Sequence, residues 1–284
     1  MSTKILGIRN RRIISLVMVY LILAALAIFA AFPFVWMALS SIKPFDEVLL
    51  FPPTIIPRNP TLHFYQRVLL FTPFMTFFLN SIIVSGATTI LSTLIAAMAG
   101  YSLARFRYRG RAFLSRGILL AYIFPQILLV VPLFTGIANL GLANTRQGLI
   151  LAYVTFTFPF STWLLAAYFQ TVPAEIEEAA KVDGASNFQV FRLIALPIAA
   201  PGLVTAAIFA FINSWNEFLY SLVILGGGKS KTLSVGLYSF IGGEFMQWGE
   251  VMAATTMIMI PTMLFFLLIQ NRIVKGLTGG ALKG

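Results

Sequence analysis

The sequence predicts an all-α integral membrane protein with six transmembrane helices, and three observations support this fold class. Hydrophobic residue types make up 59% of the 284 residues and charged types only 10%, whereas a soluble domain carries about 25% charged residues. The apolar residues are gathered in long stretches that supply the roughly 20 residues a spanning helix needs. These stretches are continuous and lack the alternation typical of a membrane β-barrel.

Six charge-poor stretches locate the expected spans. The first covers about residues 13–39 and follows a basic N-terminal segment, so it could be mistaken for a signal peptide. The apolar core of a signal peptide has roughly 7–15 residues. The apolar stretch here is longer, which favours a first span that is retained in the protein. The other five spans are expected at about 74–104, 113–136, 148–169, 198–225 and 251–272. Residues 61–71 are expected to form a short amphipathic helix on the membrane surface.

The Lys and Arg residues between the spans predict their orientation. Fourteen of the 20 lie in the N-terminal segment, the loop after the second span, the loop after the fourth span and the C-terminal tail. Positively charged loops favour the cytoplasmic side. Both termini and these two loops are therefore expected in the cytoplasm.

Several chemical functions are disfavoured by the residues present. The chain has no cysteine, and His63 is its single histidine, so neither a thiolate site nor a histidine metal cluster is expected. The net charge of +11 comes from Lys and Arg residues in short segments between the apolar stretches. This distribution is typical of the loops that set the orientation of a membrane protein. It does not indicate a nucleic-acid partner. Residues 226–230 imitate the end of a phosphate-binding loop, but Val223 stands where that motif needs glycine. No catalytic residue, cofactor site or metal site is predicted.

Residues 171–197 form the most informative segment, and they predict two short helices joined by a turn. Thr171 and Pro173 suit the start of the first helix. Gly184 can adopt the left-handed conformation that ends it. Ser186 and Gln189 have the spacing of a capping box that starts the second. From these residues alone, a solvated connector and a docking site for a soluble protein both remain open.

The same segment resembles the EAA loop of ABC importer membrane subunits, with Glu178-Ala179-Ala180, Gly184 and Ile194-x-Leu196-Pro197 at the matching positions. Residues 213–219 and the end of the chain, 276–284, resemble the maltose-type inner-membrane permeases. The likeness extends over nearly the whole chain and is weaker between residues 40 and 75. It implies the type I importer permease (MetI-like) fold, in which the first span lies peripheral to a core of the other five.

The resemblance also implies a mechanism in which this chain performs no covalent chemistry. It implies two ATPase subunits that bind ATP, a second permease chain that completes a heterodimer, and a periplasmic or lipid-anchored solute-binding protein. It places the chain in a bacterial inner membrane as carrier of a sugar or related polyol, with the tail at 273–284 reaching the ATPases. The residues that it assigns to the ATPase contact are Glu178, Ala179, Ala180, Asp183 and Gly184.

A polar patch interrupts the fifth span. Asn213, Asn216, Glu217 and Tyr220 recur at helical spacing and are expected to share one face. A charge at the bilayer centre costs roughly 2.5–3.5 kcal/mol, so Glu217 should face protein or water. Two alternatives remain open, namely a lining of the substrate path or outer gate, and hydrogen bonding between helices.

Two other transport functions are alternatives to an importer subunit. A self-contained secondary transporter tends to show repeated halves and intramembrane ion-coupling groups, but no repeat is evident and Glu217 is the one charge well inside a predicted span. A channel would need a selectivity filter, and no filter-like sequence is present. A channel or membrane scaffold would also not explain the paired short helices of residues 171–197.

Overall fold

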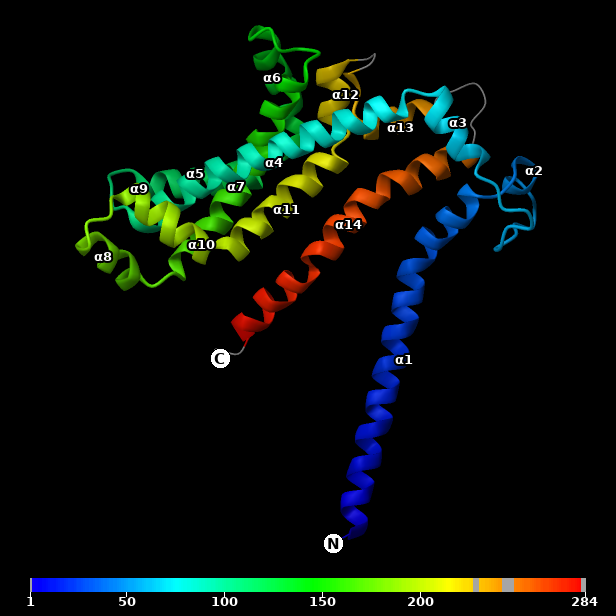
Figure 1. The fold of residues 1–284 in the computed structure, drawn as a ribbon, viewed down its shortest axis with the longest axis horizontal. Helices are drawn as coiled ribbons and strands as arrows, with labels where there is room; N and C mark the ends of the chain where they lie inside the picture. Colours follow the sequence, from blue (N-terminus) through cyan, green and yellow to red (C-terminus); the bar gives the residue numbers. More distant parts are fainter. Residues whose placement is uncertain (1, 227–229, 242–247, 282–284) are drawn as a thin grey trace. The chain divides into compact units, whose positions relative to one another are not determined.

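The computed structural model describes residues 2–226, 230–241 and 248–281, and the regular structure within these ranges is entirely helical (Figure 1). The chain divides into two compact units. The first unit comprises residues 1–71 and 243–257, and the second comprises residues 72–242 and 258–284. Residues 227–229 of the expected glycine turn and residues 282–284 of the expected tail lie outside the described residues.

The described helices confirm the predicted all-α membrane fold. Four are long and apolar enough to cross a membrane, and the number rises to six if each of two bent helix pairs is one span. The four single helices contain the segments Ile14–Ser41, Phe74–Arg105, Arg146–Gln170 and Trp248–Leu267. The bent pairs are Arg111–Ile123 with Gln126–Asn139, at 104°, and Asn187–Ile198 with Ala200–Asn216, at 78°.

Proline explains the bend in each of the two helix pairs. Pro125 follows Phe124, whose backbone is extended, because the residue before a proline is driven out of the helical conformation. Pro197 and Pro201 flank the second bend, where a proline lacks the amide hydrogen of a continuing helix. The predicted segment 113–136 is therefore interrupted, whereas the second bend, at Ala199, lies at the start of the predicted segment 198–225.

The first unit contains one long helix, two short ones and the beginning of another. Its elements are α1 (Ser2–Ser41), α2 (Phe45–Val48), α3 (His63–Phe71) and the start of α14 (Trp248–Ala281). Helix α3 confirms a short helix close to the expected range 61–71. Arg67 of α3 pairs with Glu250 of α14, with 2.6 Å between Nε and Oε1. Within this unit, none of the most apolar stretch of α1 is buried.

A buried carboxylate organises the loop after α1. Glu47 accepts hydrogen bonds from the Thr54 hydroxyl and from the Arg58 amide. Lys43 is also buried, and its ammonium donates to the Thr54 carbonyl. The hydrogen bond from Thr54 is the main reason that the pKa of Glu47 lies below its ordinary value, and the positive charges of Lys43 and Arg58 act in the same direction.

The second unit is built around α4, which packs against α7 and α11. Its elements are α4 (Phe74–Arg105), α5 (Arg111–Ile123), α6 (Gln126–Asn139), α7 (Arg146–Gln170), α8 (Ala174–Val182), α9 (Asn187–Val190), η1 (Phe191–Ala195), α10 (Leu196–Ile198), α11 (Ala200–Asn216), α12 (Leu219–Leu225), α13 (Leu233–Ile241) and the rest of α14. Helices α8 to α10 gather near the C-terminal end of α4 (Figure 1).

Small residues bring α4 and α7 close together. A Cβ atom added to Gly100 of α4 would lie 2.9 Å from the backbone nitrogen of Ala166 in α7, a separation that real Cβ atoms do not show. Small hydroxyl side chains continue this face of α4, and Ser85, Thr88 and Ser92 are fully buried. Small residues at membrane helix interfaces permit such close backbone approach, so α4 and α7 form a closely packed pair.

Candidate functional site

The segment that resembles the EAA loop begins with α8 and turns at Gly184. This glycine has a φ of +89°, the left-handed conformation that its lack of a Cβ permits. The turn is closed by hydrogen bonds from the Gly184 amide to the Lys181 carbonyl and from the Ala185 amide to the Ala180 carbonyl. The predicted glycine turn is therefore confirmed.

The capping box at the start of α9 is also confirmed. The Ser186 hydroxyl accepts from the Gln189 amide at 3.3 Å, and the Gln189 side-chain oxygen accepts from the Ser186 amide at 2.7 Å. Helix α9 then continues without a break through the π-helical turn η1 into α10. The second helical stretch is thus longer than α9 alone, and it leads to the 78° bend before α11.

The prediction that Thr171 caps the first short helix is wrong. Pro173 occupies the N-cap of α8, without a side-chain capping bond. The Thr171 hydroxyl instead donates to the Tyr168 carbonyl at the end of α7, 2.8 Å away. Threonine hydroxyls readily bond to a carbonyl three residues back, and here that local bond is formed in place of the cap.

The residues assigned to the ATPase contact lie together on and just after α8, and most are accessible. Glu178, Ala179, Asp183 and Gly184 are exposed, and Ala180 is half-buried. Apolar side chains beside them are also open to solvent, namely Ile176 at 45%, Val182 at 88% and Phe188 at 64%. Exposed apolar side chains among charged ones are typical of a protein-binding surface.

Glu177 has a role that the sequence did not reveal. Its side chain is 4% exposed and accepts a hydrogen bond from the Tyr101 hydroxyl at 2.9 Å. Its other carboxylate oxygen lies 2.8 Å from Arg105 Nε. A second nitrogen of Arg105 donates to the Val172 carbonyl at 2.6 Å. Glu177, Arg105 and Tyr101, here called the α4–α8 clamp, therefore fasten α8 to the C-terminal end of α4.

Aromatic side chains surround this clamp. The Tyr101 ring lies 5.4 Å from the ring of Phe169 in α7 and 4.9 Å from that of Phe191 in η1, between centroids. Phe106 packs against the same tyrosine at 5.8 Å. Apolar surroundings strengthen an ionic contact by lowering the local dielectric constant. The clamp therefore joins α4, α7, α8 and η1 at one place.

The polar patch of the fifth span is arranged differently from the prediction. Helix α11 ends at Asn216, Glu217 is extended with φ −69° and ψ 130°, and α12 begins at Leu219. The expectation that Asn213, Asn216, Glu217 and Tyr220 share one face of a continuous helix is therefore wrong. The break occurs because the Glu217 side chain bonds to backbone amides that follow it and thereby starts a new helix.

The Glu217 carboxylate is fully engaged by hydrogen-bond donors. One oxygen accepts from the Tyr220 amide at 2.9 Å. The other accepts from the Ser221 amide at 3.1 Å and from the Tyr153 hydroxyl of α7 at 2.9 Å. These contacts correspond to the second alternative, a carboxylate that holds helices together.

The other members of the patch bond to nearby backbone. The side-chain nitrogen of Asn213 donates to the Phe209 carbonyl, and that of Asn216 donates to the Ile212 carbonyl. The Tyr220 hydroxyl donates to the Gln126 carbonyl at the start of α6, 2.8 Å away. The structure thus brings Glu217 and Tyr220 together and leaves the two asparagines bonded to their own helix.

Comparison with known proteins now identifies the chain's family. A family model described as the binding-protein-dependent transport system inner membrane component matches residues 92–279. The chain belongs to this family. The match includes all of α5 to α13 and the later turns of α4, and therefore both the EAA-like segment and the α4–α8 clamp. As a member of this inner-membrane transport family, the chain is an integral inner-membrane protein, and the predicted relation to importer permeases is confirmed.

Individual relatives of this family member match over nearly their whole length. The inner membrane ABC transporter permease protein YcjP of Escherichia coli is 35% identical over 277 residues, which cover 97% of this chain and 99% of that protein. The trehalose/maltose transport system permease protein MalG of Thermococcus litoralis is 39% identical, with coverage of 91% and 94%. The trehalose transport system permease protein SugB of Mycobacterium tuberculosis is 38% identical, with coverage of 90% and 93%.

A solved structure supports the same assignment at the level of the fold. A chain in the crystal structure of a bacterial ABC transporter involved in the import of the acidic polysaccharide alginate superposes with a TM-score of 0.80. It is 25% identical, and the match covers 93% of this chain and 97% of that one. The helical arrangement of the importer permeases is therefore the fold of this family member.

Proposed function

We propose that this chain is the membrane-spanning permease subunit of a binding-protein-dependent ABC importer for a sugar or a related polyol. It forms half of the path through the membrane and has no ATPase site of its own. The sugar specificity rests on relatives such as MalG and SugB, whose names refer to trehalose or maltose. The other half of the path belongs to a second permease chain.

The proposed assembly also includes two ATPase subunits and a periplasmic or lipid-anchored solute-binding protein. Both termini, α8 and α9 lie in the cytoplasm in this proposal, and the Lys and Arg residues of the basic loops support that orientation. The exposed side chains of Glu178, Ala179 and Asp183, with the turn at Gly184, contact an ATPase subunit. The tail at 273–284 approaches the ATPases from the same side. ATP is bound by those subunits and not by this chain.

The observation that carries this mechanism is the attachment of an exposed short helix to the core of the second unit. Because Glu177 is bonded to Arg105 and Tyr101, a displacement of α8 moves the end of α4. Because Gly100 brings α4 into contact with α7, the two long helices move together. Closure of two ATPase subunits can thereby be converted into a change between two arrangements of the spans.

A cysteine-labelling experiment tests the orientation, since the natural chain has no cysteine. Val182→Cys and Phe51→Cys introduce a thiol at side chains that are 88% and 94% exposed. A membrane-impermeant maleimide should label Phe51→Cys in intact cells, and Val182→Cys only after the membrane is opened. Labelling of Val182→Cys in intact cells would place α8 outside and overturn the proposal.

A pair of glycine substitutions tests the ATPase contact. A Cβ at Gly184 meets nothing within 4 Å, so Gly184→Ala acts through its left-handed backbone, at a cost of about 1–2 kcal/mol. Gly117→Ala in α5, which also has no neighbour within 4 Å and no positive φ, is the matched control. Gly184→Ala should lower the amount of co-purified ATPase, and Gly117→Ala should not. Solute uptake by the purified chain without any ATPase would instead favour the secondary transporter.

A further inference from the structure

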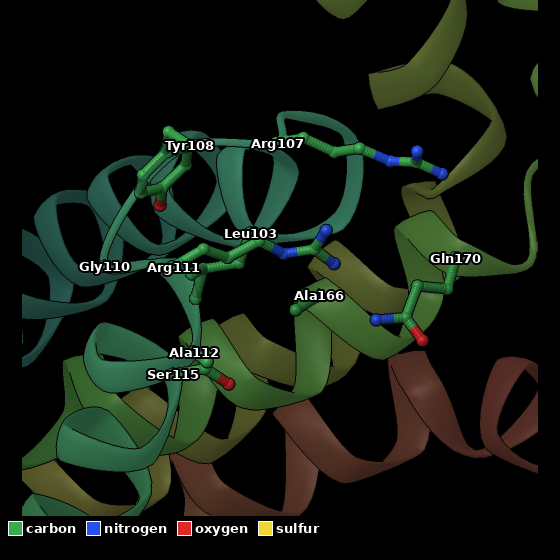
Figure 2. A pocket seen from close by; sticks show the side chains of 9 residues that line it. All are labelled: Leu103, Arg107, Tyr108, Gly110, Arg111, Ala112, Ser115, Ala166 and Gln170. Atoms are coloured by element: carbon green, nitrogen blue, oxygen red, sulfur yellow. The ribbon is translucent and has the colours of Figure 1, made fainter.

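A cavity of about 620 Å³ lies where α4 ends, α5 begins and α7 ends (Figure 2). Its polar lining is supplied by Arg107, Tyr108, Arg111, Ser115 and Gln170. Figure 2 shows the Arg111 guanidinium and the Gln170 amide extending into the space between the start of α5 and the end of α7. The volume falls within the range of roughly 300–1,000 Å³ that is typical of small-ligand pockets. This cavity is called the basic pocket below.

The two arginines of the basic pocket are available for an anion. In the described part of the chain, the ion pairs join Arg67 to Glu250 and Arg105 to Glu177. Neither Arg107 nor Arg111 has a carboxylate partner there. Arginine presents a planar set of donors that matches a phosphate group. The pocket thus combines two uncompensated positive charges with the neutral donors of Ser115 and Gln170.

The start of α5 adds to this positive potential. Gly110 is its N-cap and has no side chain to cap the helix, and the first turn contains no acidic residue. The first amides of a helix and its dipole favour an anion at this end. Gly110 and Ala112 are part of the pocket wall, so this end of α5 faces the same space as the arginines.

The position of the basic pocket identifies the source of the anion. It lies at the ends of two membrane-spanning helices, α4 and α7, which is the depth of lipid headgroups. Apolar Leu103 and Ala166 complete its wall. Along α5, Phe113 is 79% exposed and Leu120 is 67% exposed, so an acyl chain can follow this helix into the membrane.

We propose that the basic pocket binds the phosphate headgroup of an anionic membrane lipid. This inference rests on the proposed orientation, which places the pocket in the cytoplasmic leaflet, where anionic lipid attracts basic side chains. Arg105, two positions before Arg107, belongs to the α4–α8 clamp. A bound lipid therefore lies close to the α4–α8 clamp.

The test uses the assembled importer, delipidated in detergent and then given phosphatidylglycerol or phosphatidylcholine. Retained lipid is counted by native mass spectrometry. The wild-type complex should retain phosphatidylglycerol in preference to phosphatidylcholine. Arg107→Gln with Arg111→Gln should weaken phosphatidylglycerol binding by roughly 10- to 30-fold, as expected from the loss of two basic contacts at a membrane surface.

The matched control is Arg109→Gln with Arg116→Gln, which removes the same charge from two exposed arginines outside the pocket. This control should retain the lipid within about threefold of wild type, since neither side chain lines the pocket. Equal retention by all three complexes would overturn the proposal, and so would equal loss in both variants, because surface charge alone would then explain binding. Each complex must elute as one peak with its ATPases, so that misfolding is recognised.

Two further measurements separate the remaining outcomes. Millimolar inorganic phosphate should leave phosphatidylglycerol in place, and its displacement by phosphate would overturn the lipid assignment in favour of a soluble anion. Labelling of Val182→Cys in the membranes from which the complex is purified reports the orientation. Cytoplasmic labelling without selective lipid binding would overturn this inference alone, whereas extracytoplasmic labelling would overturn the proposed function.

Discussion

Arg105 and Glu177 are separated by 72 positions in the sequence, yet their side chains form an ion pair with 2.8 Å between Nε and Oε1. The Arg105 side chain is 16% exposed and that of Glu177 is 4% exposed. Because Arg105 ends α4 and Glu177 lies in the first turn of α8, the pair connects the candidate ATPase contact to the membrane-spanning core.

Glu177→Gln is expected to destabilise the chain and to uncouple transport from ATP hydrolysis. Removing one partner of a buried ion pair leaves the other uncompensated, at a cost of about 3 kcal/mol. Chemical unfolding in mixed micelles measures the stability. The number of solutes imported per ATP hydrolysed measures the coupling, which a purely structural role would not alter.

Glu175→Gln is the matched control for this prediction. Glu175 lies in the same turn of α8 but is exposed, so its replacement should leave both measurements within experimental error of wild type. If Glu177→Gln and Glu175→Gln gave the same transport ratio, the α4–α8 clamp would have no part in coupling.

Gly100→Ala is expected to separate α4 from α7. The added Cβ would lie 2.9 Å from the Ala166 backbone nitrogen, and backbone atoms yield less readily than a flexible side chain. Such overpacking costs about 1–3 kcal/mol, which thermal unfolding should detect. Gly86→Ala in the same helix has no atom within 4 Å and should be neutral or slightly stabilising. Equal behaviour of the two variants would show that the helices do not pack so closely.

Glu217→Gln is expected to lower stability without changing the affinity for solute. The amide has one acceptor oxygen where the carboxylate has two, so at least one of the donors from Tyr220, Ser221 and Tyr153 loses its partner. The loss should be about 1–3 kcal/mol. Asn216→Ala, which removes one bond to the Ile212 carbonyl at an exposed side chain, is the control with a smaller effect. A raised KM for uptake at unchanged stability would instead favour a lining of the substrate path.

The contacts of Glu47 are expected to make the loop between α1 and α3 less stable in acid. The hydrogen bond from Thr54 lowers the pKa of Glu47 from its ordinary value of 4.5, so the folded loop favours the ionised form. The contact therefore stabilises the loop at pH values above about 4.5, and this stabilisation is lost as the pH falls through the lowered pKa. Deuterium exchange of the Arg58 amide, corrected for its intrinsic rate, should rise over that interval.

The variant Thr54→Val tests the direction of this pH dependence. Removing the principal hydrogen bond raises the pKa of Glu47 toward its ordinary value, so the loop should open at a higher pH than in wild type. An unchanged opening pH would mean that the Glu47 contacts do not control the loop.

The features that the sequence predicted correctly are short-range ones. Ser186 and Gln189 are three positions apart, and their capping box forms from side-chain types at a fixed spacing. Gly184 ends α8 because no other residue type adopts its backbone so readily. The membrane class followed from composition alone, because no soluble surface can be made from so few charged residues.

The features that the sequence did not predict depend on partners far along the chain. Glu175, Glu177 and Glu178 look alike in sequence, and the tertiary fold alone places Tyr101 and Arg105 against the second of them. The break at Glu217 also escaped prediction, since a run of apolar residues contains no signal for where a carboxylate will meet a tyrosine from another helix.

By itself, the amino-acid sequence determined that this protein is a helical membrane protein of the importer permease family, with two short helices joined by a glycine turn after its fourth span. Hydrophobicity, charge placement and capping act over a few residues and can be read along the chain. The tertiary structure alone decided which glutamate of α8 is buried, where Glu217 interrupts the fifth span, and which arginines line a pocket. Those outcomes depend on which distant side chains meet, because a charge is buried only where the fold supplies its partner.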